Sequence, residues 1–203
     1  DTFSNKRREF DEMSQWNPLH DLVTLQDRMN RLFEDATQRR ASEADKSDEL
    51  ERAESVLFAL ARSIEGKDPY TEGHCERLAD YSARLAEYMG LPAPQIKALR
   101  RAGIVHDIGK VAVPDSILLK PAKLTRTEQV ILRRHPVVGE RICAPLKSFQ
   151  LVLPIIRHHH EKMNGSGYPD GLKGDQIPLS ARIFAVVDVW DALRSDRPYR
   201  TGW

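Results

Sequence analysis

The placement of histidine most constrains how this chain can fold, since six of its seven histidines fall between residues 74 and 160. His74 lies one helical turn before Leu78, and Ile131 lies one turn before His135. Such spacing predicts amphipathic helices whose apolar faces, histidines included, turn toward the core. Buried imidazoles need hydrogen-bond or metal partners. The fold must therefore bring several helix ends together around these side chains.

The chain after Pro69 has the pattern of helices separated by Gly/Pro loops, and it has no alternating pattern of apolar and polar residues that would indicate strands. We therefore predict an all-α domain. Thr125 and Glu128 have the spacing of a capping box, and Ser180 is a candidate N-cap. Helices are expected over residues 71–89, 94–107, 136–144, 148–161 and 180–194, with a further helix starting at Thr125.

The N-terminal part has a different pattern. Residues 1–49 are predicted to form an extension with an amphipathic helix over 16–36 and a charged linker over 37–49. Residues 50–68 are predicted to form a connecting helix. Apolar residues at alternating three-and-four spacing over 50–64 suit a helix that pairs with a copy of itself, and equally one that packs on its own domain.

Composition narrows the class of protein. The chain is 40% hydrophobic and 30% charged, and its apolar runs are far shorter than a membrane span. No charged-then-apolar leader opens it, and two cysteines, Cys75 and Cys143, fit a reducing cytoplasm. Residues 71–203 carry 20 Lys/Arg against 14 Asp/Glu without a dense basic run. This balance favours a small anionic substrate over a nucleic-acid polymer.

The polar residues on apolar faces can be interpreted singly or together. A lone histidine on an apolar face is more often a hydrogen-bonded core residue than a ligand. An aspartate within an apolar run, as Asp188 is, is more often paired with a buried arginine or a helix N-terminus than with a metal. Five histidines and two aspartates on inward helix ends would need partners all at once, and one or two metal ions satisfy them together. Asp107 directly follows His106, so its two oxygens could bridge two metals while His106 binds one.

Two ordered motifs in the sequence resemble those of the HD-GYP phosphodiesterases, a branch of the HD metal-dependent phosphohydrolase superfamily. The resemblance runs from about residue 55 to the end of the chain. The motifs are His106-Asp107-Ile108-Gly109-Lys110, and His159-His160-Glu161 followed by Asn164-Gly165-Ser166-Gly167-Tyr168-Pro169.

The resemblance implies an HD-domain helical bundle over residues 69–203, and we expect its last helices to be missing. It implies hydrolysis of cyclic di-GMP, a bacterial second messenger, to pGpG, GMP or both, by in-line attack of a hydroxide that bridges two metals. Iron or manganese is expected first, with nickel, zinc or cobalt as alternatives. The implied metal ligands are His74, His106, Asp107, His135, His159, His160 and Asp188.

The resemblance also implies roles for other residues. His106, Asp107 and Lys110 are the catalytic candidates, and Lys110 would contact substrate phosphate. Some relatives hold a third metal through a glutamate where this chain has Tyr70, so we expect two metals. His158 is left out, because adjacent helical residues point about 100° apart. The substrate-binding candidates are Lys110, Arg182, Asp191, Arg197, Arg200 and the loop residues Gly167, Tyr168 and Pro169; this loop is also a candidate contact for a protein partner.

Other interpretations stay open. Residues 16–36 resemble the N-terminal arm of small heat-shock proteins, although an unrelated amphipathic helix explains them equally well and no α-crystallin domain follows. The domain could be a non-catalytic cyclic-dinucleotide receptor or a protein-interaction module. It could also be an HD hydrolase of another cyclic dinucleotide. The complete set of seven ligand candidates favours the enzyme.

Overall fold

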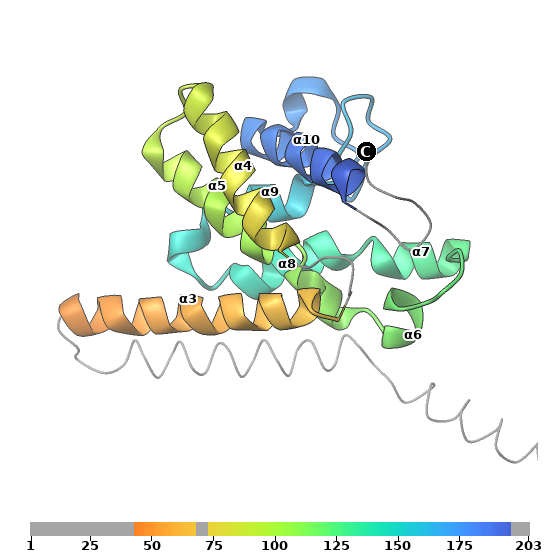
Figure 1. The fold of residues 1–203 in the computed structure, drawn as a ribbon, viewed down its shortest axis with the longest axis horizontal. Coiled ribbons are helices and arrows are strands. Elements are labelled where there is room, and N and C mark those ends of the chain that lie inside the picture. The colour runs from red at the N-terminus through yellow and green to blue at the C-terminus, as the bar shows by residue number, and fades with distance from the viewer. Residues whose placement is uncertain (1–42, 68–72, 196–203) are drawn as a thin grey trace, which may run out of the picture. The chain divides into compact units, whose positions relative to one another are not determined.

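The computed structural model describes residues 43–67 and 73–195 of the chain (Figure 1). The predicted helix over 16–36 lies outside the described residues, as do Tyr70, Arg197 and Arg200. None of the helices described is long and apolar enough to cross a membrane.

The described residues form helices only, so the prediction of an all-α domain is confirmed. The one extended pairing among them is an isolated bridge between Asn164 and Lys173. The elements are α3 (Glu43–Glu65), α4 (His74–Tyr88), α5 (Ala93–Val105), η1 (Ile108–Ala112), α6 (Asp115–Leu118), α7 (Arg126–Leu132), α8 (His135–Cys143), η2 (Lys147–Phe149), α9 (Leu153–His158), η3 (Gly174–Gln176) and α10 (Leu179–Arg194).

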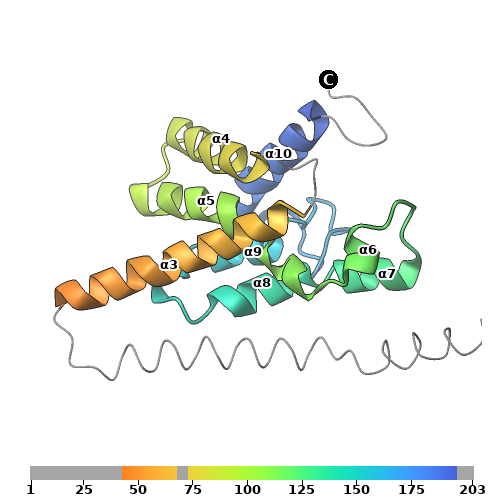
Figure 2. The same ribbon diagram turned by 60° about the horizontal axis from the view of Figure 1, so that its bottom comes forward.

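Helix α3 packs on the rest of the domain. Leu57, Ala61 and Ile64 are buried on the face that contacts α5 and η1, and Figure 2 shows α3 running along this side of the bundle. The helix thus packs on its own domain, and pairing with a second copy through residues 50–64 stays a prediction. It also begins at Glu43, inside the predicted linker. The predicted domain boundaries at residues 49 and 68 stay predictions as well.

The core joins two sets of helices. Helix α4 packs against α5 and α10, while α8 packs against η1 and α9 (Figure 1). Leu78, Leu99 and Phe184 are fully buried in the first set, and Ile155 and Ile156 of α9 fill the second. The start of α4, the end of α5, the start of α8 and the end of α9 carry the predicted ligand histidines.

Local signals account for some of the helix ends. Thr125 caps α7, and its capping box with Glu128 is confirmed. The predicted helix over 148–161 was too long, because the chain forms η2 and then the six-residue α9 with Pro154 in its first turn. A proline fits there because the first helical turn needs no N–H from it. The prediction of Ser180 as an N-cap was wrong, since Pro178 occupies that position.

Candidate metal centre

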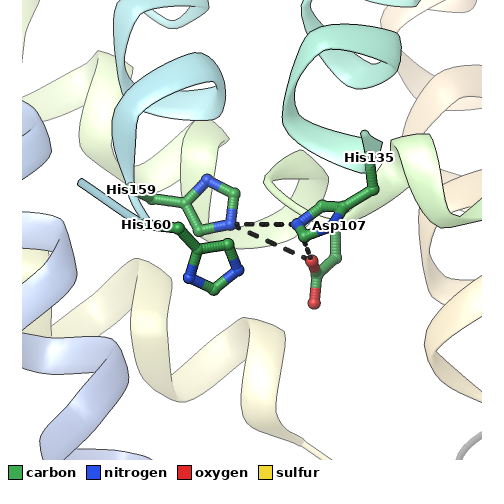
Figure 3. Close-up of side chains that lie close together, drawn as sticks. All are labelled: Asp107, His135, His159 and His160. Carbon is green, nitrogen blue, oxygen red and sulfur yellow. Dashed lines mark hydrogen bonds and ion pairs between the residues drawn. The ribbon is translucent and has the colours of Figure 1, made fainter. Parts of the chain in front are cut away.

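The seven predicted metal ligands gather into two groups at the meeting point of the helix ends. Within each group, one ligand atom from every residue lies within 4.8 Å of the others. Figure 3 shows how the larger group converges from the residue before η1, the start of α8 and the two residues after α9. The four-residue group is Asp107, His135, His159 and His160, and the three-residue group is His74, His106 and Asp188.

A close approach of two backbones brings the first members of the four-residue group together. A Cβ atom on Gly109 would overlap the carbonyl oxygen of His135 and would lie 2.6 Å from the backbone nitrogen of Gly139. Only glycine therefore lets η1 lie directly against the start of α8. As a result, Oδ1 of Asp107 lies 3.1 Å from Nε2 of His135.

Asp107 stands between the two groups. Its Oδ1 faces the four-residue group, 3.1 Å from Nε2 of His135 and 4.0 Å from Nε2 of His159. Its Oδ2 lies 3.2 Å from Nε2 of His106 and 2.6 Å from Nζ of Lys110. Oδ1 is buried and accepts no hydrogen bond from the described residues. A buried carboxylate oxygen in this position fits a cation, because burial without a partner is costly.

Hydrogen bonds orient most of the imidazoles. Nδ1 of His106, His135 and His159 each lies near the backbone carbonyl oxygen three residues earlier, at 3.1, 2.9 and 2.7 Å. When Nδ1 donates to a carbonyl, Nε2 is left with a lone pair for a metal. This donor set of oriented imidazoles and carboxylates fits divalent transition metals.

The electrostatics of the site favour the protonation states that metal binding needs at Asp107, His159 and His160. Burial lowers the pKa of His159 well below its usual range and that of His160 to about 3, so both rings are neutral. Burial alone would raise the pKa of Asp107, but Lys110 and His106 hold it well below its usual range. Burial would likewise lower the pKa of His106, but the Asp107 carboxylate raises it. The ionised Asp107 and the neutral His159 and His160 are therefore in their ligand forms, whereas a metal at His106 competes with a proton that Asp107 stabilises.

Asp191 lies behind the three-residue group. We predicted a substrate contact for it, but the side chain is 2% exposed and its Oδ2 lies 2.8 Å from Nδ1 of His74. Arg77 donates to Oδ1 at 2.7 Å and to Oδ2 at 3.0 Å. On the other side of the same ring, Oδ1 of Asp188 lies 3.5 Å from Nε2 of His74. We therefore propose that Asp191 orients His74 and does not touch substrate.

The remaining substrate-binding candidates are placed differently. Lys110 lies at the site through its ion pair with Asp107. Tyr168, between Gly167 and Pro169, packs its ring 4.8 Å from that of His160. Arg182 pairs with Asp175 at 2.8 Å, and none of its ion pairs or hydrogen bonds among the described residues reaches either group.

Glu161 belongs to the motif that begins at His159, but the sequence did not indicate a role for it. The residue is 6% exposed, and its carboxylate accepts hydrogen bonds from three successive backbone N–H groups of the loop over residues 170–172. The signal that could have found it is its position directly after His159 and His160, where an unpaired carboxylate would be costly to bury.

Comparison with known proteins agrees with this geometry. A family model described as "HD domain" matches residues 59–203. The chain belongs to the HD-domain family. This membership confirms the family that the sequence motifs indicated.

Curated relatives carry phosphodiesterase names. Over 155 residues the chain is 44% identical to "Cyclic di-GMP phosphodiesterase response regulator RpfG" of Xanthomonas campestris. The matched region covers 75% of this chain and 41% of that protein. A "Cyclic di-GMP phosphodiesterase" of Thermotoga maritima is 44% identical over 71% of this chain and 40% of that protein. A "3'3'-cGAMP-specific phosphodiesterase 2" of Vibrio cholerae is 41% identical over 75% of this chain and 30% of that protein. The chain thus spans less than half the length of these relatives.

Proposed function

We propose that this chain is a metal-dependent phosphodiesterase domain that hydrolyses cyclic di-GMP to pGpG, GMP or both. The observation that carries the proposal is the position of Asp107, with one carboxylate oxygen toward each ligand group. The names of the relatives support the substrate class. Two divalent cations fit the two groups, and iron or manganese is the first candidate for histidine-rich sites with carboxylates.

The cations, when bound, would supply Lewis acidity to the phosphoryl group and would activate the attacking water. The protein would hold them through imidazoles, four of which already have Nδ1 hydrogen-bonded. Asp107 would join the two sites through its separate oxygens and thereby set their spacing. In-line displacement at phosphorus is the reaction that two cations held in this way would support.

Lys110 would bind the phosphate of the substrate. Its ammonium lies 2.6 Å from Oδ2 of Asp107, so it stands beside the point where the two groups meet. There its charge would stabilise the negative charge that develops on a non-bridging phosphoryl oxygen. The surplus of basic residues over 71–203 would draw in a small dianionic substrate.

A second candidate substrate is 3′3′-cGAMP. Three of the curated relatives, at 37–41% identity, are named for this cyclic dinucleotide. The two substrates present the same phosphodiester ring to the metal ligands, so the ligand groups do not separate them. The choice between them depends on contacts with the bases.

The test is turnover measured by HPLC on protein purified anaerobically and reconstituted with Mn(II) or Fe(II). Cyclic di-GMP, 3′3′-cGAMP and deoxynucleoside triphosphates are compared, and metal is counted on the same sample. We expect turnover of cyclic di-GMP with about two metals per chain. Faster turnover of 3′3′-cGAMP would make this dinucleotide the substrate in place of cyclic di-GMP. Absence of both turnover and metal would favour an interaction module.

Substitution of Asp107 tests the site itself. Asp107→Ala should abolish turnover and lower the metal content, because both groups lose a shared oxygen ligand. The matched control is Asp48→Ala, which removes the same side chain from an exposed position of α3. An active, fully metallated Asp107→Ala protein would rule out this site.

A further inference from the structure

His160 differs from the other histidines of the two groups. Nδ1 of His74 is fixed by a carboxylate, and Nδ1 of His106, His135 and His159 by backbone carbonyls. Among the described residues, the ring of His160 makes no hydrogen bond, so nothing of that kind selects its orientation. Something else must turn its ring toward the four-residue group.

Ring contacts take the place of the hydrogen bond. The His160 ring centroid lies 4.0 Å from that of His159 and 4.8 Å from that of Tyr168. The planes of His160 and Tyr168 are inclined by 33°, so the phenol ring packs against the imidazole in a tilted arrangement. The His135 ring meets His160 edge-on at 5.1 Å. Packed between these three rings, His160 cannot rotate about its side-chain bonds without losing contacts.

Tyr168 is itself held in place. The guanidinium of Arg133 lies 5.2 Å from the centre of its ring, a cation–π contact. Burial raises the pKa of the Tyr168 phenol, so the ring stays neutral. The backbone N–H of Tyr168 donates to the carbonyl oxygen of His160 at 3.3 Å, which ties the two residues directly.

Glu161 fastens the loop that carries Tyr168. Its Oε1 accepts the backbone N–H groups of Asp170 and Gly171 at 2.7 and 3.0 Å, and its Oε2 accepts that of Leu172 at 3.1 Å. A carboxylate buried in this way is stabilised by these three donors. A Cβ atom on Gly167 would lie only 2.7 Å from the carbonyl carbon of Glu161, so the loop runs in direct backbone contact with it.

A second set of polar contacts, made by Arg157 and His158, holds the same loop through Asp170. Arg157 donates from Nε and Nη2 to the two carboxylate oxygens of Asp170 at 2.7 and 2.8 Å. Nε2 of His158 lies 3.0 Å from Oδ2 of the same aspartate. His158 therefore serves the loop and not the ligand groups, which agrees with its exclusion from the predicted ligands.

We propose that Tyr168 and Glu161 are positioning residues for the ligand His160. Glu161 holds the loop over residues 167–172, and the loop presses the Tyr168 ring onto the imidazole. The contact sets the ring orientation that a backbone carbonyl sets for the other histidines of the four-residue group. The inference rests on the proposed function, because it takes His160 as a metal ligand.

The experiment is a titration of metal-free protein with Co(II), followed by visible absorption and calorimetry. In the wild type we expect two binding steps. Tyr168→Leu should weaken one step by about 10- to 100-fold, the range for loss of a residue that orients a ligand. The other step, from the three-residue group, should not change and serves as an internal control. Tyr168→Phe keeps the ring and should bind as the wild type does.

A double-mutant cycle separates positioning from a general loss of structure. His160→Ala should weaken the same step, and adding Tyr168→Leu to it should bring no further loss, because the ring to be oriented is gone. If Tyr168→Leu weakens both steps alike, or weakens binding equally with and without His160, the inference is overturned.

Two further results complete the test. Should Tyr168→Leu fail to fold, Glu161→Gln takes its place, because this variant keeps the tyrosine and loosens the loop. Glu161→Gln should weaken the same cobalt-binding step. Wild-type cobalt binding by Glu161→Gln would then overturn the inference. The proposed metal centre itself predicts that the wild type has a cobalt-binding step and that Asp107→Asn removes it. If there is no such step, the metal centre fails. If the wild type binds two ions and Tyr168→Leu binds them equally well, only the role of Tyr168 fails.

Discussion

Replacing Gly109 with alanine should disturb both the fold and the metal centre. The added Cβ would overlap the carbonyl oxygen of His135 and lie 2.6 Å from the backbone nitrogen of Gly139, where ordinary contacts begin at 3.4 Å. The backbone of η1 must then move away from α8 by roughly 1 Å or more. Because both obstacles are backbone atoms, we expect a loss near the upper end of the overpacking range, about 3 kcal/mol. The same shift separates Asp107 from His135.

Two measurements check the effect of Gly109→Ala. The midpoint temperature of thermal unfolding of the metal-free protein should fall by about 6–12 °C, because 1 kcal/mol of stability corresponds to about 2–4 °C for a chain of this size. Cobalt binding at the four-residue group should weaken by about 10- to 100-fold. Gly66→Ala is the matched control, because its Cβ would approach nothing closer than 3.4 Å. Wild-type unfolding and wild-type metal affinity in Gly109→Ala would refute the argument that this glycine places Asp107 beside His135.

Three further substitutions address other parts of the structure. Asp191→Asn should weaken cobalt binding at the three-residue group by about 10- to 100-fold, because His74 loses its carboxylate partner; an unchanged titration would show that Asp191 does not orient it. Glu54→Ala should lower the free energy of unfolding in urea by about 3 kcal/mol, since it leaves Nη2 of the largely buried Arg101 without its carboxylate partner; a change below about 0.5 kcal/mol would mean that α3 does not depend on this pair. Thr125→Ala should cost about 1 kcal/mol in the same assay by removing the cap of α7, and no change would show that the capping box contributes nothing.

The helices were largely predictable from local patterns. Apolar residues at helical spacing located α4, α5, α8 and α10 to within a few residues, because one turn of helix decides which side chains share a face. The miss over 148–161 has a local reason. Pro154 is accepted only in a first helical turn, so α9 had to start beside it, and the apolar run alone hid the break.

The ligand set was predictable in its residue types and not in its partners. Motifs marked His160 and Asp107, but nothing local indicated that Tyr168 would pack against the His160 ring. The contact of Asp191 with His74 could not be predicted either, because this hydrogen bond spans 117 residues of chain. That bond depends on how α10 packs against α4, which no local spacing expresses.

The sequence by itself determined an all-α chain, the faces of its helices and the residue types that could hold metal, since helix formation depends on neighbours three and four positions apart. The tertiary structure alone decided that seven residues between positions 74 and 188 divide into two groups joined at Asp107. It also decided which side chains orient them. The physical reason is that these contacts arise from close packing between helices distant in sequence, such as η1 against α8 at Gly109, and packing of this kind depends on the whole core at once.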